Sequence, residues 1–148
     1  MKDRDEKIFV VGAGIMGHGI AQCFAMAGYR VSLFSRKEET LNRAEVLIKS
    51  SLDTLAREGL VNKEDIPEIR KKIEMTRSLE QGAAEADLAI ETVVENRDVK
   101  KDIFARLDEL CPPGALLASN TTALNIFDFV ETSRPGRVLI AHWYTPPQ

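Results

Sequence analysis

The chain has 148 residues, of which 44% are hydrophobic and 29% are charged, enough for one globular domain with a core of its own. The formal net charge of -3 argues against a nucleic-acid-binding protein, which would normally carry a basic patch. We see no signal peptide and no apolar stretch long enough to cross a bilayer. Cys23 and Cys111 show neither metal-ligand nor disulfide-rich spacing. We therefore expect a cytoplasmic protein without a membrane, nucleic-acid or metal partner.

Short apolar runs recur along the chain, and most of them lack strict alternation of apolar and polar residues. Such runs are typical of strands that are buried on both faces of a parallel sheet. The predicted strands are residues 8–11, 31–34, 88–93, 115–119 and 138–141, with a weaker one at 73–76.

Helical patterns fall between these strands, at residues 15–27, 38–58, 63–72 and 98–110. Alternating strands and helices predict the α/β class, with a doubly wound, mostly parallel sheet. Two helices between the second and third strands exceed an ordinary crossover, so we expect a helical hairpin insertion there. The predicted buried face of the first helix comprises Met16, Ile20, Cys23, Phe24 and Ala27.

The segment "VVGAGIMGHG" carries three glycines, Gly12, Gly14 and Gly17, in G-x-G-x-x-G spacing. The motif follows a predicted strand and opens a helix, which is the context of a dinucleotide-binding Rossmann fold. Gly12 allows the tight turn, Gly14 lets a pyrophosphate approach, and Gly17 lets helix and strand pack closely. Ile15 and Met16, in the first helical turn, are expected to offer backbone N–H groups to the phosphates.

The second predicted strand is followed by Ser35, Arg36 and Lys37. An acid at this position usually accepts hydrogen bonds from the adenosine ribose of NAD. A hydroxyl followed by two cations would instead attract the 2′-phosphate of NADP. The alternative is that both cations are solvated loop charges, so the predicted cofactor is NAD or NADP.

Four segments considered together carry a family resemblance: the glycine loop, "LAIETVVENRDVKKDIFARLD", "ALLASNTTALNI" and "LIAHWYTPP". In this order they resemble the NAD-binding domain of the 3-hydroxyacyl-CoA dehydrogenase family, with its motifs G-A-G-x-M-G, V-x-E-x-x-x-V-K, S-N-T-S-S-L and H-F-F-N-P. The resemblance extends from Lys7 to Pro147.

The resemblance implies an NAD(P)-dependent oxidoreductase that oxidises an L-3-hydroxyacyl-CoA to the 3-ketoacyl-CoA. His142 matches the general base of the family, which a downstream glutamate orients. Ser119 matches the serine that hydrogen-bonds the substrate oxygen, and Asn120 follows it in the cofactor-binding loop. From spacing alone, His142 would instead be a structural histidine stacked against Trp143 and Tyr144.

Further positions follow from the same resemblance. Glu95 and Lys100 match residues that contact the ribose and nicotinamide side of the cofactor, although spacing alone also allows a helix-terminal acid and a solvated charge. Thr145 stands where the family has an asparagine near the nicotinamide. Ser51 matches a serine that binds CoA, whereas the partner lysine falls near Arg57 and the following glutamate.

The family also has a C-terminal helical domain that dimerises, so we expect a homodimer of the full-length protein. Residues 1–148 would form only the dinucleotide-binding domain, and we expect this isolated domain to be catalytically incomplete. Two alternatives stay open: a dehydrogenase of a non-CoA 3-hydroxy acid, and a non-catalytic nucleotide-binding module.

Overall fold

The computed structural model describes residues 4–147 and contains one six-stranded sheet. All of its strand pairs are parallel, in the order β3-β2-β1-β4-β5-β6. The order reverses between β1 and β4, which is the switch point where open α/β sheets bind ligands. The predicted fold class is confirmed. The strands are β1 (Lys7–Val11), β2 (Arg30–Phe34), β3 (Ile73–Thr76), β4 (Leu88–Glu91), β5 (Leu116–Ser119) and β6 (Val138–Ile140).

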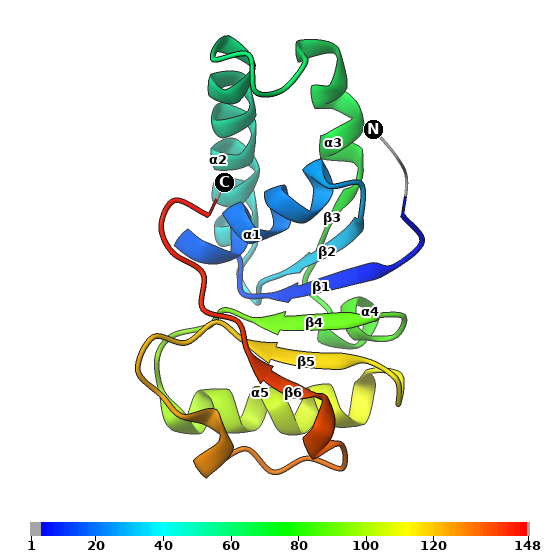
Figure 1. Ribbon diagram of the computed structural model, residues 1–148, viewed down its shortest axis with the longest axis vertical. Helices are drawn as coiled ribbons and strands as arrows, with labels where there is room; N and C mark the ends of the chain where they lie inside the picture. The colour runs from blue at the N-terminus through cyan, green and yellow to red at the C-terminus, as the bar shows by residue number, and fades with distance from the viewer. Residues whose placement is uncertain (1–3, 148) are drawn as a thin grey trace.

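Helices cover both faces of the sheet (Figure 1). One core cluster combines side chains of the first three helices with one face of the strands, and a second cluster combines the last two helices with the other face. The helices are α1 (Ile15–Met26), α2 (Glu38–Arg57), α3 (Ile66–Lys71), α4 (Leu79–Ala83) and α5 (Arg97–Leu110). Short 3-10 turns occupy Lys63–Asp65, Ile126–Asp128 and Pro135–Arg137. Among residues 4–147, no helix combines the length and apolarity that a membrane span requires.

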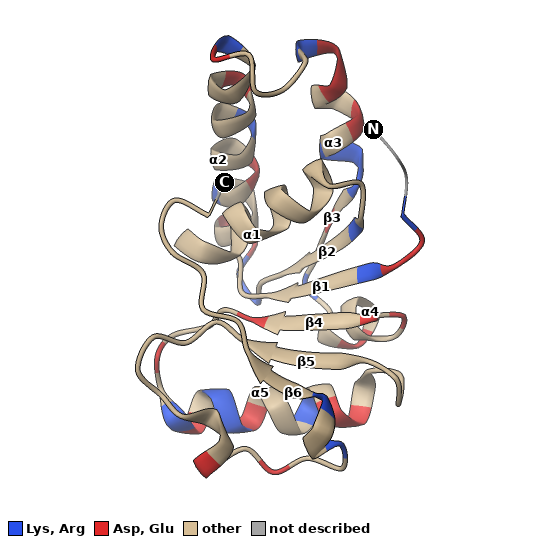
Figure 2. Cartoon of the chain, viewed as in Figure 1, with Lys and Arg blue, Asp and Glu red and all other residues tan. Residues whose placement is uncertain are grey.

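The predicted helical hairpin is formed by α2 and α3, whose connected ends extend beyond the sheet (Figure 1). The second helix of the pair is shorter than expected, because its predicted start is a 3-10 turn at Lys63–Asp65. Figure 2 shows charged residues distributed over α2, α3 and α5, while the strands carry few of them. One exception is β4, which ends on the fully buried Glu91.

The predicted buried face of α1 was partly wrong. Ile20 is buried as expected, but Ala27 is exposed, and the other buried positions are mostly small residues: Gly17, Gly19, Ala21 and Ala25. A helix that lies close to the sheet buries its small side chains, because larger ones would hold the two backbones apart. The predicted residues Met16 and Phe24 pack against the same core while remaining partly exposed, so the prediction missed the small residues that lie closest to the sheet.

Two further details of the far face were not predicted. Helix α4 has only five residues, and the Ser78 hydroxyl caps it by accepting the N–H of Gln81 at 3.1 Å. In α5 the fully buried positions are Lys100, Phe104 and Leu107. Two other apolar residues of the same helix, Ile103 and Leu110, are only half-buried.

Candidate cofactor and active site

The glycine loop joins β1 to α1 at the switch point of the sheet. The Gly12 N–H donates to the Phe34 carbonyl at 3.0 Å, and the φ angle of Gly12 is +115°, which L side chains rarely adopt. A Cβ atom at Gly17 would lie 1.7 Å from the Gly12 carbonyl oxygen. The Thr92 hydroxyl, just beyond β4, donates to that same carbonyl at 2.7 Å. These contacts give Gly12 and Gly17 the turn and close-packing roles that the motif predicts.

Gly14 differs from its two neighbours in the motif, since nothing lies within 4 Å of a Cβ built on it. It stands at the N-cap of α1, which has no side-chain cap and no acid in its first turn. The first N–H groups of a helix need partners, and they carry the positive end of its dipole. Open space before an uncapped helix start fits a pyrophosphate held by the N–H groups of Ile15 and Met16.

The end of β2 lies beside the glycine loop. The Ser35 N–H donates to the Thr76 carbonyl at 3.2 Å, which joins the ends of β2 and β3. The half-buried Ser35 hydroxyl accepts the N–H of Lys37 at 3.3 Å, whereas the side chains of Arg36 and Lys37 are exposed. A ribose extending from the loop along this edge would meet a hydroxyl and cations, without a carboxylate at the Ser35 position.

A buried polar network lies at the carboxyl ends of β4 and β5. Both carboxylate oxygens of Glu91 are 2.8 Å from the Lys100 ammonium, and the Ser119 hydroxyl donates to Glu91 at 2.6 Å. The Val93 N–H donates to the same carboxylate at 2.7 Å. Glu91, Lys100 and Ser119 are all fully buried. The interpretation of Lys100 as a solvated charge is therefore wrong.

Glu91 was not among the site residues predicted from the sequence. The available signal was an acid at the end of an apolar run, "LAIE", where a buried strand of a parallel sheet ends at the ligand-binding edge. Buried carboxylates need a cationic or hydrogen-bonding partner, so an acid at this position would also have indicated a lysine or arginine beside it.

Glu95 connects this network to the loop after β5. Its carboxylate lies 3.3 Å from the Lys100 ammonium. It accepts the Thr121 hydroxyl and three backbone N–H groups, those of Thr122, Ala123 and Leu124, at 3.1, 3.2 and 3.4 Å. Partial burial opposes ionisation, but these hydrogen bonds and the nearby ammonium outweigh it and lower the pKa of Glu95 from 4.5 to about 2. Glu95 therefore holds residues 121–124 in place as a carboxylate.

His142 follows β6, next to the end of β5. The Ala141 N–H donates to the Ser119 carbonyl, and the Trp143 N–H donates to the Asn120 side-chain oxygen, each at 2.9 Å. These two bonds fix the backbone on both sides of His142. The exposed imidazole has its Nε2 3.4 Å from the Thr122 hydroxyl, and its ring lies 4.5 Å from that of Tyr144.

The segment after His142 crosses the first turns of α1 (Figure 1). The Thr145 hydroxyl lies 3.1 Å from the Met16 sulfur, and the Trp143 ring packs against Phe24 with centroids 5.9 Å apart. Thr145 therefore lies beside the helix start that would bind the pyrophosphate. The last residue, Gln148, is outside the described residues.

Ser51 lies apart from these groups, on α2. Its hydroxyl accepts the side-chain N–H of the buried Gln22 at 3.0 Å, which joins α2 to α1. It also lines an open groove of about 420 Å³ between α1, α2 and the last residues, bordered by His18, Leu47, Ser50, Thr54, Leu55 and Pro146. The structure thus places Ser51 on the hairpin near the tail, outside the cluster of Ser119, Asn120 and His142.

The parallel sheet, the glycine loop at its switch point and the polar groups at the ends of β2, β4, β5 and β6 define a dinucleotide-binding domain of the Rossmann class. Residues 7–148 match the family model described as 3-hydroxyacyl-CoA dehydrogenase, NAD binding domain. The chain belongs to this family, as the sequence motifs predict.

Relatives and solved structures agree with this assignment. The chain is 37% identical over 141 residues to 3-hydroxybutyryl-CoA dehydrogenase of Clostridioides difficile, a match that covers 95% of the chain and 50% of the relative. It is 32% identical over 142 residues to L-carnitine dehydrogenase of Streptomyces coelicolor, with coverages of 95% and 43%. A crystal structure of 3-hydroxybutyryl-CoA dehydrogenase from Escherichia coli superimposes with a TM-score of 0.91 at 34% identity, covering 96% of this chain and 30% of that one. The chain therefore spans about half the length, or less, of these relatives.

Proposed function

We propose that this chain supplies the cofactor site and the general base for oxidation of an L-3-hydroxyacyl-CoA to the 3-ketoacyl-CoA, with NAD or NADP as the oxidant. The observation that carries the proposal is one of placement. The open approach at Gly14 and the pair of Ser119 and His142 lie at the same carboxyl edge of the sheet. A nucleotide-binding module without catalysis needs the first feature but not the second.

The residues divide the chemistry between them. His142, an exposed imidazole with a backbone fixed on both sides, would take the proton of the substrate hydroxyl, because imidazole is the side chain most often used as a general base. The nicotinamide, when bound, accepts the hydride from the same carbon. In the structure Ser119 donates its proton to Glu91, so to donate to the substrate oxygen while His142 takes the hydroxyl proton, Ser119 would have to turn its O–H toward the substrate. Asn120 and Glu95 would keep the loop beneath the nicotinamide in place.

We propose that turnover needs more protein than these residues. In the structure the hydrogen-bonding partner of the His142 ring is a neutral hydroxyl, and no carboxylate is bonded to that ring within residues 4–147. The 3-hydroxybutyryl-CoA dehydrogenase of Clostridioides difficile is about twice as long as the chain. We infer that a further domain brings the orienting carboxylate, covers the acyl group and makes the homodimer. The cytoplasm is the proposed location.

The experiment is a pair of measurements on the 148-residue chain. Calorimetry with NAD and NADP should show binding, while oxidation of 3-hydroxybutyryl-CoA should be barely detectable. In a full-length protein that contains this domain, His142→Ala should abolish turnover and leave nucleotide binding intact. Failure to bind either nucleotide would contradict the proposal. Turnover that survives His142→Ala would contradict the assigned base and favour a non-catalytic role for this domain.

A second candidate function is oxidation of a 3-hydroxy acid that is not a CoA ester, and the hairpin favours it. The position expected to hold the CoA-binding lysine falls near Arg57. The guanidinium of Arg57 bonds its own helix, through the Thr54 hydroxyl at 3.0 Å and the Asp53 carbonyl at 3.4 Å. Similarity to a carnitine dehydrogenase shows that such substrates occur among the relatives. Comparing 3-hydroxybutyryl-CoA with free 3-hydroxybutyrate and carnitine, using the full-length protein, decides between the two.

A further inference from the structure

We propose that the adenosine-ribose site selects NADP over NAD, and that Arg77, at the end of β3, belongs to the site together with Ser35 and Arg36. The inference rests on the proposed function only in that this edge of the sheet binds a dinucleotide. The inference goes beyond the proposed function in two ways. It says which of the two cofactors is preferred, and it assigns to the site Arg77, which follows β3 and lies outside the glycine motif.

The position of Ser35 is fixed by the backbone on both sides. The preceding Phe34 carbonyl accepts the Gly12 N–H at 3.0 Å, so the end of β2 touches the glycine loop. The Ser35 N–H donates to the Thr76 carbonyl at 3.2 Å, so the end of β3 lies on its other side. Arg77 is the residue immediately after Thr76, and it therefore lies one strand away from the expected ribose position.

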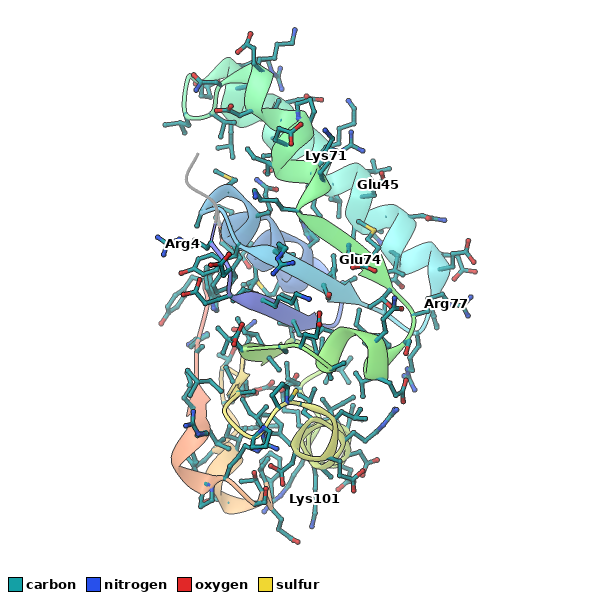
Figure 3. The ribbon with its side chains drawn as sticks, turned by 90° about the vertical axis from the view of Figure 1, so that its right-hand side faces the viewer. Arg4, Glu45, Lys71, Glu74, Arg77 and Lys101 are labelled. Carbon is teal, nitrogen blue, oxygen red and sulfur yellow. The ribbon has the colours of Figure 1, made fainter. Side chains whose placement is uncertain are left out.

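Arg77 extends toward the start of α2, as Figure 3 shows. One of its guanidinium nitrogens lies 3.7 Å from the Glu38 carboxylate in the first turn of that helix, and both side chains are largely exposed. An ion pair of this length between exposed groups is weak. The guanidinium of Arg77 can therefore turn to a phosphate at little cost. When no nucleotide is bound, it offsets the negative charge of Glu38.

The charges around this turn favour a 2′-phosphate. Arg36, Lys37 and Arg77 are cationic, and Glu38 and Glu39 are the acids of the first turn of α2, so the local balance is three positive charges against two negative ones. An acid in place of Ser35 would cancel the excess and would lie against the ribose itself. Arginine offers planar, paired donors that match phosphate geometry.

Ser35 contributes a hydroxyl whose O–H is available as a hydrogen-bond donor. Its oxygen accepts the Lys37 N–H at 3.3 Å, so the O–H is left to donate to a phosphate oxygen. A carboxylate in the same place could only accept, which suits the two ribose hydroxyls of NAD and repels the phosphate of NADP. The same turn thus discriminates through both hydrogen-bond polarity and charge.

The test compares NADPH with NADH on the 148-residue chain, since the two differ only in the 2′-phosphate. The single tryptophan, Trp143, lies two residues before Thr145, whose hydroxyl is 3.1 Å from the Met16 sulfur in the first turn of α1, so its fluorescence should respond to binding at the start of that helix. Hydrogen bonds to charged groups contribute enough for NADPH to bind about 10- to 100-fold more tightly. The ratio should fall as salt is raised, because exposed charges are screened. The fragments 2′,5′-ADP and 5′-AMP should show the same order without a nicotinamide.

Three variants locate the effect. Ser35→Asp should reverse the preference, and Arg77→Ala should weaken NADPH about 3- to 10-fold, the loss of one exposed charged contact, while leaving NADH unchanged. Arg70→Ala is the matched control, because Arg70 also pairs with an acid of α2, Glu45 at 3.0 Å, but precedes β3. It should change neither nucleotide.

Equal affinities, or tighter NADH, would overturn the inference and leave the proposed function standing. Binding of neither nucleotide would overturn both. An Arg77→Ala variant that weakens NADH and NADPH equally would remove Arg77 from the 2′-phosphate site.

Discussion

The two halves of the site are built in opposite ways. At the glycine loop, Gly12 and Gly17 let the backbone form the binding surface, and the contacts that matter are steric. At the ends of β4 and β5, the surface is held by side chains, with Glu91, Lys100 and Ser119 bonded to one another out of contact with solvent. The loop should therefore be sensitive to added volume, and the network to a change of charge at constant volume.

Gly17→Ala should have the largest effect. The added Cβ would lie 1.7 Å from the Gly12 carbonyl oxygen and 2.8 Å from the Thr92 hydroxyl, and the Gly12 backbone cannot yield without moving α1. We expect a loss of about 4 kcal/mol or more in the free energy of unfolding, the upper range for single substitutions, measured by urea denaturation. Gly114→Ala is the control, since nothing lies within 4 Å of its Cβ position. Equal stability of the two variants would show that the loop is not sterically closed.

Lys100→Met should come next, since it keeps the length of the side chain and removes the charge. Glu91 would then be a buried carboxylate without its cation, and breaking a buried pair costs about 3–5 kcal/mol. Adding Glu91→Gln to this variant should recover part of the loss, because the uncompensated charge is gone. Denaturant titrations of the single and double variants measure this. A double variant less stable than Lys100→Met alone would contradict the explanation by charge.

The same contrast explains how much the sequence could predict. The strands could be predicted because successive residues such as Phe9 and Val10, which point to opposite faces of the sheet, are both apolar. The glycine loop could be predicted because each glycine of the motif has a structural role at a fixed spacing. Lys100 could not be placed in this way. An apolar stripe on α5 leaves a lysine on the solvated side by default, and its burial depends on Glu91, which belongs to another element.

Positions that depend on two elements at once were the ones missed or misplaced. Glu95 is predictable as an acid near a helix start, but its bonds to residues 121–124 require the loop after β5 to fold back onto it. On α1, the buried face follows from how closely the helix approaches the sheet rather than from its own apolar pattern. Which side chains become buried or bonded in these places depends on how two elements pack together, and the residue pattern of one segment does not show this.

Gly14→Ala should separate the two properties of the glycine loop. Gly14 has a φ of -73° that alanine adopts readily, and its Cβ would enter open space, so we expect a stability change below about 1 kcal/mol for this N-cap position. The methyl group would occupy the approach of the pyrophosphate, and NADH and NADPH should both bind about tenfold more weakly, the loss of one hydrogen bond to a charged group. Titration of both nucleotides checks this. Unchanged affinity would place the phosphates elsewhere.

Glu95→Gln should have the smallest effect on stability, and the size of that effect depends on pH. The folded-state pKa of about 2 lies below the usual 4.5, so the carboxylate stabilises the fold fully above pH 4.5 and loses that contribution as the pH falls toward 2. Because the side chain is 38% exposed, solvent screening should keep the contribution at neutral pH to about 1 kcal/mol or less.

The wild type should be the more stable protein at pH 7, and the difference should vanish near pH 2. Other carboxylates with lowered pKa values, such as Asp108, titrate in both proteins, so the difference between their urea midpoints isolates Glu95. A gap that persists unchanged at pH 2 would mean that the amide disturbs the loop by its shape rather than by its lost charge.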